Sequence, residues 1–273
     1  MKILEYSLNN RSTLREFENK FYSLVQGNNR SNRYLGKNFS FCALEDKGDV
    51  KIILFDFDDG TGITPCRPGI LDGDCKLDFE KLENLKKDYN TNSVVVFKSQ
   101  MNKDACKYYP FKENVHPLGY FSGNYKHLVD VKKVFKKTKK DIDLIWIGTV
   151  DTGATPWNWP EGQDIKMWPS GWRIEGYNRV NKLVEKRKDL NIVFSSNKMG
   201  KEQYYNLINR SKICLELPGC GWFTRRFVEN LCLEKCILSM KQAQELPFDL
   251  IENLHYHSLG DNFDNLESQI DHL

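Results

Sequence analysis

From residue 143 onward, short apolar runs alternate with segments in which apolar residues recur every three or four positions. The short runs predict buried strands at 143–147, 191–195, 212–217 and 236–240. The periodic segments predict helices at 176–189, 202–209 and 224–234. Strands and helices that alternate in this way form a parallel sheet with helices on both faces, and such sheets bind ligands at the carboxyl ends of their strands.

The first half of the chain is less regular but contains the same two kinds of segment. Thr13 and Glu16 form a capping-box pattern that predicts the start of a helix. Almost continuous apolar runs predict buried strands at 50–57 and 93–97, with a helix at 78–89 between them.

A basic, polar segment at 132–140 separates the two halves and predicts a linker. We therefore expect an α/β protein with two Rossmann-like domains, residues 1–138 and residues 139–258. The remaining residues, 259–273, include a final helix that is expected to pack back on the first domain.

Composition restricts the classes of partner and compartment. Among the 273 residues, 40 Lys and Arg stand against 37 Asp and Glu, and this balance argues against a nucleic-acid partner. No apolar run approaches the about 18 residues of a membrane span, and no signal peptide is recognised. The eight cysteines form no Cys-x-x-Cys pair. We therefore expect free thiols in the reducing cytoplasm, not disulfides or a zinc site.

The strongest candidate site is segment 217–229, where an apolar strand ends, a glycine loop turns and a helix begins. Glycines let a ligand approach the backbone, and a helix N-terminus favours a phosphate. Arg225 or Arg226 would add charge-assisted hydrogen bonds to a diphosphate, and Glu229 is placed to accept hydrogen bonds from ribose hydroxyls. The alternative is a plain turn with solvated arginines, but two arginines in a first helical turn oppose the helix dipole and favour a bound anion.

Segments 205–219, 224–229 and 235–238 match a known pattern in order and spacing. The first looks like Leu-x-x-Ser-Lys-Phe-Cys-Leu followed by Pro-Gly, the second like Ser-Arg-Arg-x-x-Glu, and the third like Gly-Cys-Ile-Pro-Val. Together they resemble the exostosin-like glycosyltransferases, glycosyltransferase family 47. Glu234 and Leu238 depart from that pattern, which has glycine and proline there.

The resemblance implies GT-B architecture, in which two Rossmann-like domains face a cleft, and an inverting reaction with a UDP-sugar. It also implies that Arg226 and Glu229 contact the donor's phosphate and ribose. No membrane anchor is recognised, and a compact, anchorless member would suit a virus, acting in the host cytoplasm, or a microbe. The candidate donor-binding residues lie at strand ends and on the helices that follow them: Gly148, Thr149, Arg173, Arg179, Ser195, Gly219, Gly221, Thr224, Arg225, Arg226 and Glu229.

A tryptophan-rich loop at 155–173 contains Trp157, Trp159, Trp168 and Trp172. Aromatic faces commonly stack on sugar rings or nucleobases, which makes the loop a second candidate for ligand contact. The alternative is that buried indoles attach the loop to its own domain.

An inverting transferase needs a base that takes the proton of the acceptor hydroxyl. An acidic cluster directly follows the predicted strand 50–57, so Asp58 and Asp59 are the first candidates. Asp72 and His116 are further candidates. In an alternative interpretation of the same cluster, its acidic residues are ordinary turn residues with no catalytic role.

The expected function is transfer of a sugar from a UDP-sugar, such as UDP-xylose or another UDP-hexose or UDP-uronate, to a glycan hydroxyl. No tightly bound cofactor or divalent metal is expected, since arginine and the helix dipole can neutralise the leaving group. Two alternatives remain. One is a magnesium-dependent phosphatase that uses Asp56 and Asp58, although Thr61 stands one position late for that motif. The other is a carbohydrate-binding protein without catalysis.

Overall fold

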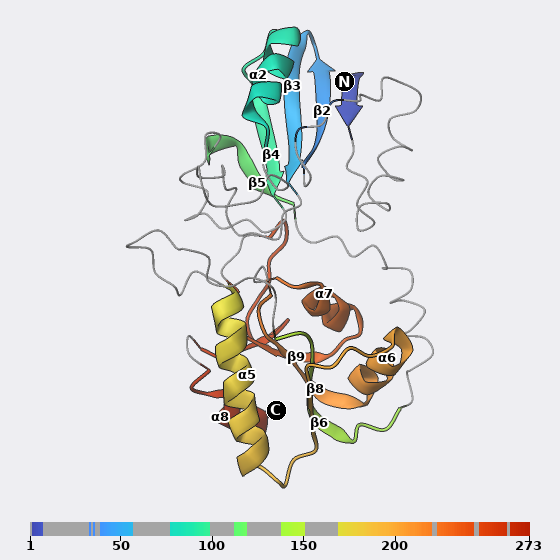
Figure 1. Cartoon of the computed structure of the whole chain (residues 1–273), viewed down its shortest axis with the longest axis vertical. Coiled ribbons are helices and arrows are strands. Elements are labelled where there is room, and N and C mark those ends of the chain that lie inside the picture. Colours follow the sequence, from blue (N-terminus) through green and yellow to red (C-terminus); the bar gives the residue numbers. More distant parts are fainter. Residues whose placement is uncertain are drawn as a thin grey trace. The chain divides into compact units, whose positions relative to one another are not determined.

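The computed structural model describes most of the chain and divides it into two compact units (Figure 1). One unit holds residues 1–123 and 244–248, and the other holds residues 124–243 and 249–273. The described residues are 2–7, 33, 35, 39–56, 77–98, 112–118, 138–150, 169–219, 223–242, 246–260 and 263–273. The capping-box helix near Thr13 and most of the tryptophan-rich loop lie outside this set.

The first unit contains a five-stranded mixed sheet in the order β1-β2-β3-β4-β5. Its described elements are β1 (Lys2–Ser7), β2 (Phe39–Asp46), β3 (Asp49–Asp56), α2 (Phe79–Asp88), β4 (Val94–Lys98), the short 3-10 helix η2 (Lys112–Asn114) and β5 (Val115–Pro117). The pairs β3–β4 and β4–β5 are parallel, whereas β1–β2 and β2–β3 are antiparallel. The expectation of a parallel sheet is therefore correct here only for β3 to β5.

A tight turn explains the antiparallel pairing. Lys47 and Gly48 both have positive φ, 54° and 90°, and they connect the paired residues Asp46 and Asp49. Two successive residues with positive φ match the twist of a two-residue hairpin. The chain therefore reverses after β2, and β3 returns beside it.

The second unit has an all-parallel sheet in the order β10-β9-β8-β6-β7. Its elements are β6 (Ile142–Ile147), α5 (Pro169–Lys186), β7 (Ile192–Ser195), α6 (Lys201–Arg210), β8 (Ser211–Glu216), α7 (Arg225–Cys232), β9 (Cys236–Ser239), β10 (His257–Ser258) and α8 (Leu266–His272). The strand–helix alternation expected from the sequence is confirmed in this unit.

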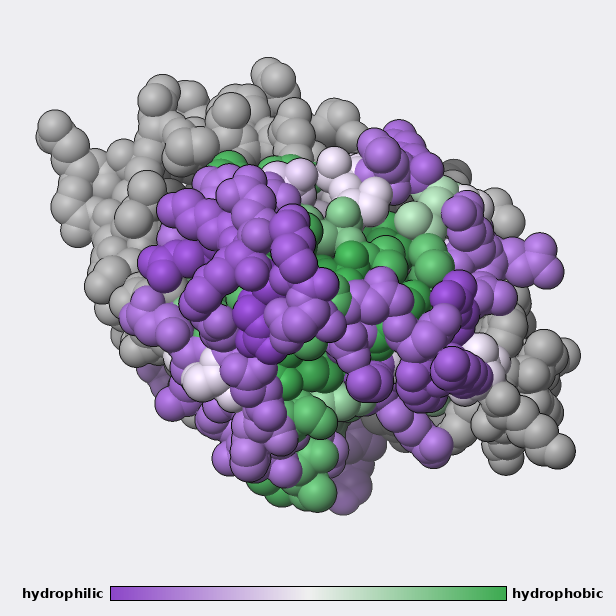
Figure 2. Space-filling view, turned by 90° about the horizontal axis from the view of Figure 1, so that it is seen from below, coloured by the Kyte–Doolittle hydropathy of each residue, from purple (hydrophilic) through white to green (hydrophobic). Residues whose placement is uncertain are grey.

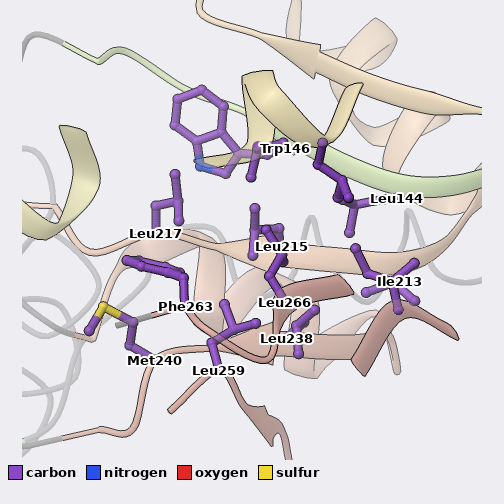
Figure 3. Close-up of a cluster of buried hydrophobic side chains, with 13 residues drawn as sticks. Leu144, Trp146, Ile213, Leu215, Leu217, Leu238, Met240, Leu259, Phe263 and Leu266 are labelled. Carbon is purple, nitrogen blue, oxygen red and sulfur yellow. The ribbon is translucent and has the colours of Figure 1, made fainter. Parts of the chain in front are cut away.

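Helices cover both faces of this sheet (Figure 1). On one face, Val180 and Leu183 of α5 and Leu266 of α8 pack in a single core with Leu144 and Leu238 of the strands. Figure 3 shows the inward-pointing side chains of this core, with Trp146 and Leu217 at its edge. The other face packs against α6 through Ile208. The final helix thus belongs to the second unit, because its apolar residues complete that unit's core; the expectation that it also packs on the first unit stays a prediction.

Ion pairs join the last residue of α5, and the residue that follows it, to α8 at the surface. Arg187 pairs with Asp271 at 2.8 Å, and Lys186 pairs with Glu267 at 2.7 Å. Figure 2 shows hydrophilic side chains surrounding an apolar strip on the face that it presents.

Among the described helices, none has the length and apolar character needed to cross a membrane. The described cysteines, Cys42, Cys214, Cys232 and Cys236, are free thiols.

Gly176 of α5 lies against the core of the second unit. A Cβ added there would come within 2.5 Å of Leu217 Cδ2 and 2.9 Å of Phe263 Cζ. Because overpacking a dense core costs about 1–3 kcal/mol, Gly176→Ala is expected to lower the free energy of unfolding by about that amount. Urea unfolding of the whole chain measures it. Gly200→Ala is the control for crowding, since its Cβ meets open space and its cost comes only from its place as the N-cap of α6; an effect of Gly176→Ala no larger than that cost would contradict this packing.

Candidate anion site at the ends of beta6 and beta8

The order of the second sheet has one reversal point. β6 continues through α5 to β7 on one side, whereas β8 continues through α7 to β9 on the other side. Helix α7 joins α6 on the face opposite α5, because Tyr205 of α6 bonds to Glu229 of α7. The connections that leave β6 and β8 therefore diverge to opposite faces. In open α/β sheets this switch point is where ligands bind.

Arg173 of α5 links the ends of the two strands. It is buried, at 7% exposure. Its Nε donates to the carbonyl of Pro218, which follows β8, and its Nη1 donates to the carbonyl of Thr149, which follows β6, at 2.9 Å. A guanidinium from the early part of α5 therefore lies directly at the switch point.

Arg226 reaches the same place from the first turn of α7. Its Nη1 donates to the carbonyl of Ile147, and its guanidinium carbon lies 5.4 Å from the ring centre of Trp146, within range of a cation–π contact. Its Nε lies 3.8 Å from Glu216 Oε2, and its side chain is 17% exposed. Two arginines from helices on opposite faces of the sheet thus converge on residues 147–149.

The two glycines at this place have a common role. A Cβ on Gly148 would overlap Nη1 of Arg226, and a Cβ on Gly219 would lie 2.8 Å from Nη2 of Arg173. Neither glycine has a positive φ. In this structure, therefore, the absence of a side chain at these positions makes room for the arginines. The sequence interpretation assigned that room to a ligand.

A hydrogen-bond chain joins the start of α7 to the end of β8. Thr224 is the N-cap of α7, and its hydroxyl accepts from Phe227 N at 3.2 Å while donating to Glu216 Oε2 at 3.0 Å. Asn230 Nδ2 donates to Glu216 Oε1 at 2.6 Å. Burial raises the pKa of Glu216, and the positive charge of Arg226 opposes that shift. We name Gly148, Thr149, Arg173, Glu216, Gly219, Thr224 and Arg226 the switch-point site.

Glu216 was not singled out from the sequence. The signal was available, because Glu216 is a carboxylate between Leu215 and Leu217 at the end of an apolar strand. A buried charge is tolerated only when it is paired or hydrogen-bonded. A charged residue inside such a run therefore indicates a polar network in the folded protein.

Glu229 and Arg225 form a second pair on α7. Glu229 Oε1 accepts from Arg225 Nε at 2.8 Å and from the Tyr205 hydroxyl at 3.2 Å. The Glu229 side chain is 5% exposed and that of Arg225 is 45% exposed. Burial raises the pKa of Tyr205 to about 12, so its hydroxyl stays a donor to Glu229 at neutral pH. The contacts in this structure make Glu229 a residue that holds Arg225; the ribose contact expected from the resemblance stays a prediction.

The other candidates divide into three groups. Ser195 adjoins the site, since its carbonyl accepts from Gly148 N at 3.0 Å. Arg179 does not join it, because its side chain pairs with Glu175 and Asp264 at the surface. His116 lies in the first unit, where it is exposed and its ring centre is 5.6 Å from that of Phe97. Outside the described residues lie Asp58, Asp59, Asp72, Gly221, Trp157, Trp159 and Trp168.

Trp172 is the part of the tryptophan-rich loop that the structure describes. It is partly buried and packs against the core of the second unit, with its ring 6.2 Å from that of Phe263. For this indole, the interpretation as an attachment to its own domain is the one that these contacts favour.

The described residues contain no group of three or more His, Cys, Asp or Glu that could hold a metal ion. Comparisons of the chain with protein-family models, with curated proteins and with solved structures give no match. The chemistry of the switch-point site therefore has to be argued from its own residues. Its two guanidinium groups and the start of a helix suit an anion with several oxygen atoms, whereas its carboxylate, Glu216, opposes one.

Proposed function

We propose that this chain is an inverting glycosyltransferase of GT-B architecture that binds the diphosphate of a UDP-sugar at the switch-point site. The observation that carries the proposal is the convergence of Arg173 and Arg226, from opposite faces of the sheet, beside the start of α7. Planar guanidinium groups suit phosphate oxygens, and a helix start adds positive potential. The resemblance of segments 205–219 and 224–229 to exostosin-like enzymes supports the same reading.

In the proposed reaction, a base takes the proton of an acceptor hydroxyl, whose oxygen attacks the anomeric carbon from the face opposite the diphosphate. The bond between that carbon and the phosphate oxygen breaks, and UDP leaves with the electron pair. Arg173, Arg226 and the start of α7 stabilise the charge that grows on the leaving diphosphate, usually the largest single term in catalysis. Asp58, Asp59, Asp72 and His116 remain the proposed candidates for the base.

UDP binding by the whole chain is the direct test. UDP is expected to stabilise the protein by about 2.7 kcal/mol at a concentration 100 times its Kd, whereas uridine, which lacks phosphates, should give much less. A thermal-shift series with UDP, GDP, CDP and uridine measures this. If no nucleoside diphosphate at millimolar concentration shifts the melting temperature, the proposal is wrong.

A further inference from the structure

Glu216 is a buried carboxylate beside the arginine proposed to bind the diphosphate. We propose that Glu216 is a built-in counter-ion of Arg226 that competes with a bound anion, so that anion binding is accompanied by uptake of a proton at Glu216. This inference rests on the proposed function and adds a property of the same site, a proton-linked affinity.

Glu216 lies where it can both pair with Arg226 and respond to an anion bound by Arg226. Its side chain is 3% exposed, and its Oε2 lies 3.8 Å from Arg226 Nε while accepting from the Thr224 hydroxyl. Arg226 therefore forms an ion pair with this carboxylate. An anion drawn to Arg226 therefore adds a negative charge close to a carboxylate that is almost completely buried.

The charged groups around Glu216 come from two helices, and a third helix adds a neutral hydroxyl. Arg226 of α7 and Arg173 of α5 favour its ionised form, whereas burial and Glu229 of α7 oppose it. On α6, burial raises the pKa of Tyr204, and the charge of Glu216 raises it further. Because these influences oppose one another, the protonation of the carboxylate is sensitive to one further charge. A phosphate that neutralises Arg226 removes the main support of the ionised form.

A protonated Glu216 could donate a hydrogen bond to the side chain of Asn230. Asn230 already touches Glu216 through Nδ2 at 2.6 Å, and its own Oδ1 is buried without a hydrogen-bond partner. A half-turn of the Asn230 amide would bring this oxygen to the protonated carboxyl. The proton comes from solvent, no covalent bond changes, and the neutral state leaves the carboxyl hydrogen-bonded.

Calorimetry of UDP binding in two buffers with different ionisation enthalpies tests the inference, because the difference between them reports protons taken up. Wild type is expected to take up more protons than Glu216→Gln, by up to about one per UDP. Glu216→Gln is also expected to bind UDP on the order of tenfold more tightly at neutral pH, because a nearby like charge is removed. Titration of UDP itself contributes equally to both proteins. Glu267→Gln, the same change on the exposed surface of α8, should behave as wild type.

The outcomes separate the two proposals. UDP binding with equal proton uptake in wild type and Glu216→Gln would overturn this inference alone, whereas absence of UDP binding in wild type would overturn both. If Glu216→Gln does not fold, carboxyl NMR of wild type labelled with carbon-13 in glutamate gives the answer. One buried carboxyl should move to its protonated position on addition of UDP, and an unmoved spectrum would overturn the inference.

Discussion

Arg226→Ala is expected to remove most of the affinity for UDP. Hydrogen bonds to a charged partner contribute about 1.5–3 kcal/mol each, so losing two of them to a diphosphate lowers affinity by about 100-fold or more. The free energy of unfolding should also fall, by about 1–3 kcal/mol, because Glu216 loses the cation that lies 3.8 Å from it. Titration of UDP by calorimetry measures the first effect, and urea unfolding measures the second.

Two variants sharpen this prediction. Arg226→Lys keeps the charge but loses the planar group that lies over Trp146, so it should recover only part of the affinity. Arg179→Ala is the matched control, since Arg179 pairs with Glu175 and Asp264 at the surface and should leave UDP binding unchanged. Wild-type UDP affinity in folded Arg226→Ala would show that Arg226 does not bind the diphosphate.

Gly148→Ala is expected to disable the same site from the end of the neighbouring strand, β6. The new methyl group would overlap the position of the Arg226 Nη1, and the backbone of Gly148 itself permits alanine because its φ is not positive. The guanidinium must then leave the Ile147 carbonyl and the ring of Trp146. UDP affinity should fall at least tenfold, for the same reason as in Arg226→Ala.

A double-mutant cycle identifies the cause. Once Arg226 is alanine, the methyl group at position 148 has no guanidinium to displace and its nearest remaining contact is Trp146 Cζ2, at 3.2 Å, so Gly148→Ala should then add much less. The expected coupling between the two changes is about 0.5–3 kcal/mol in unfolding or in UDP binding. Gly200→Ala, which meets open space, serves as the control glycine. Strictly additive effects would show that Gly148 acts independently of Arg226.

The strands and helices of the second unit could be predicted from the sequence because the patterns that indicate them are local. Each strand, such as 211–216, is a compact apolar run, and each helix, such as 201–210, has its own periodic face. The predicted bounds of these two elements differ from the observed ones by one residue at each end. The order of the parallel strands creates the switch point between β6 and β8. This is why Gly148 and Gly219, which are distant in sequence, lie at one site.

In the first unit, local sequence patterns did not predict every strand. Strands β1 and β2 were not predicted, and β1 depends on pairing with a distant segment, since Tyr6 lies opposite Cys42. A strand has no internal hydrogen bonds, so a short one is stabilised only by the neighbour it meets after folding. The reversal at Lys47 and Gly48 is likewise clear only from the backbone, because a lysine with positive φ is uncommon.

At the candidate site, the sequence alone determined the residue types and their place after a strand. It indicated Thr224 as the start of a helix and Arg226 as a cation there. Only the tertiary structure decided what these residues touch. It placed Arg173 and Arg226 together from opposite faces, assigned the space at both glycines to guanidinium groups, and buried Glu216 among Thr224, Asn230 and Arg226. The physical reason is that local periodicity determines secondary structure, whereas burial and the pairing of charges depend on which distant segments come together.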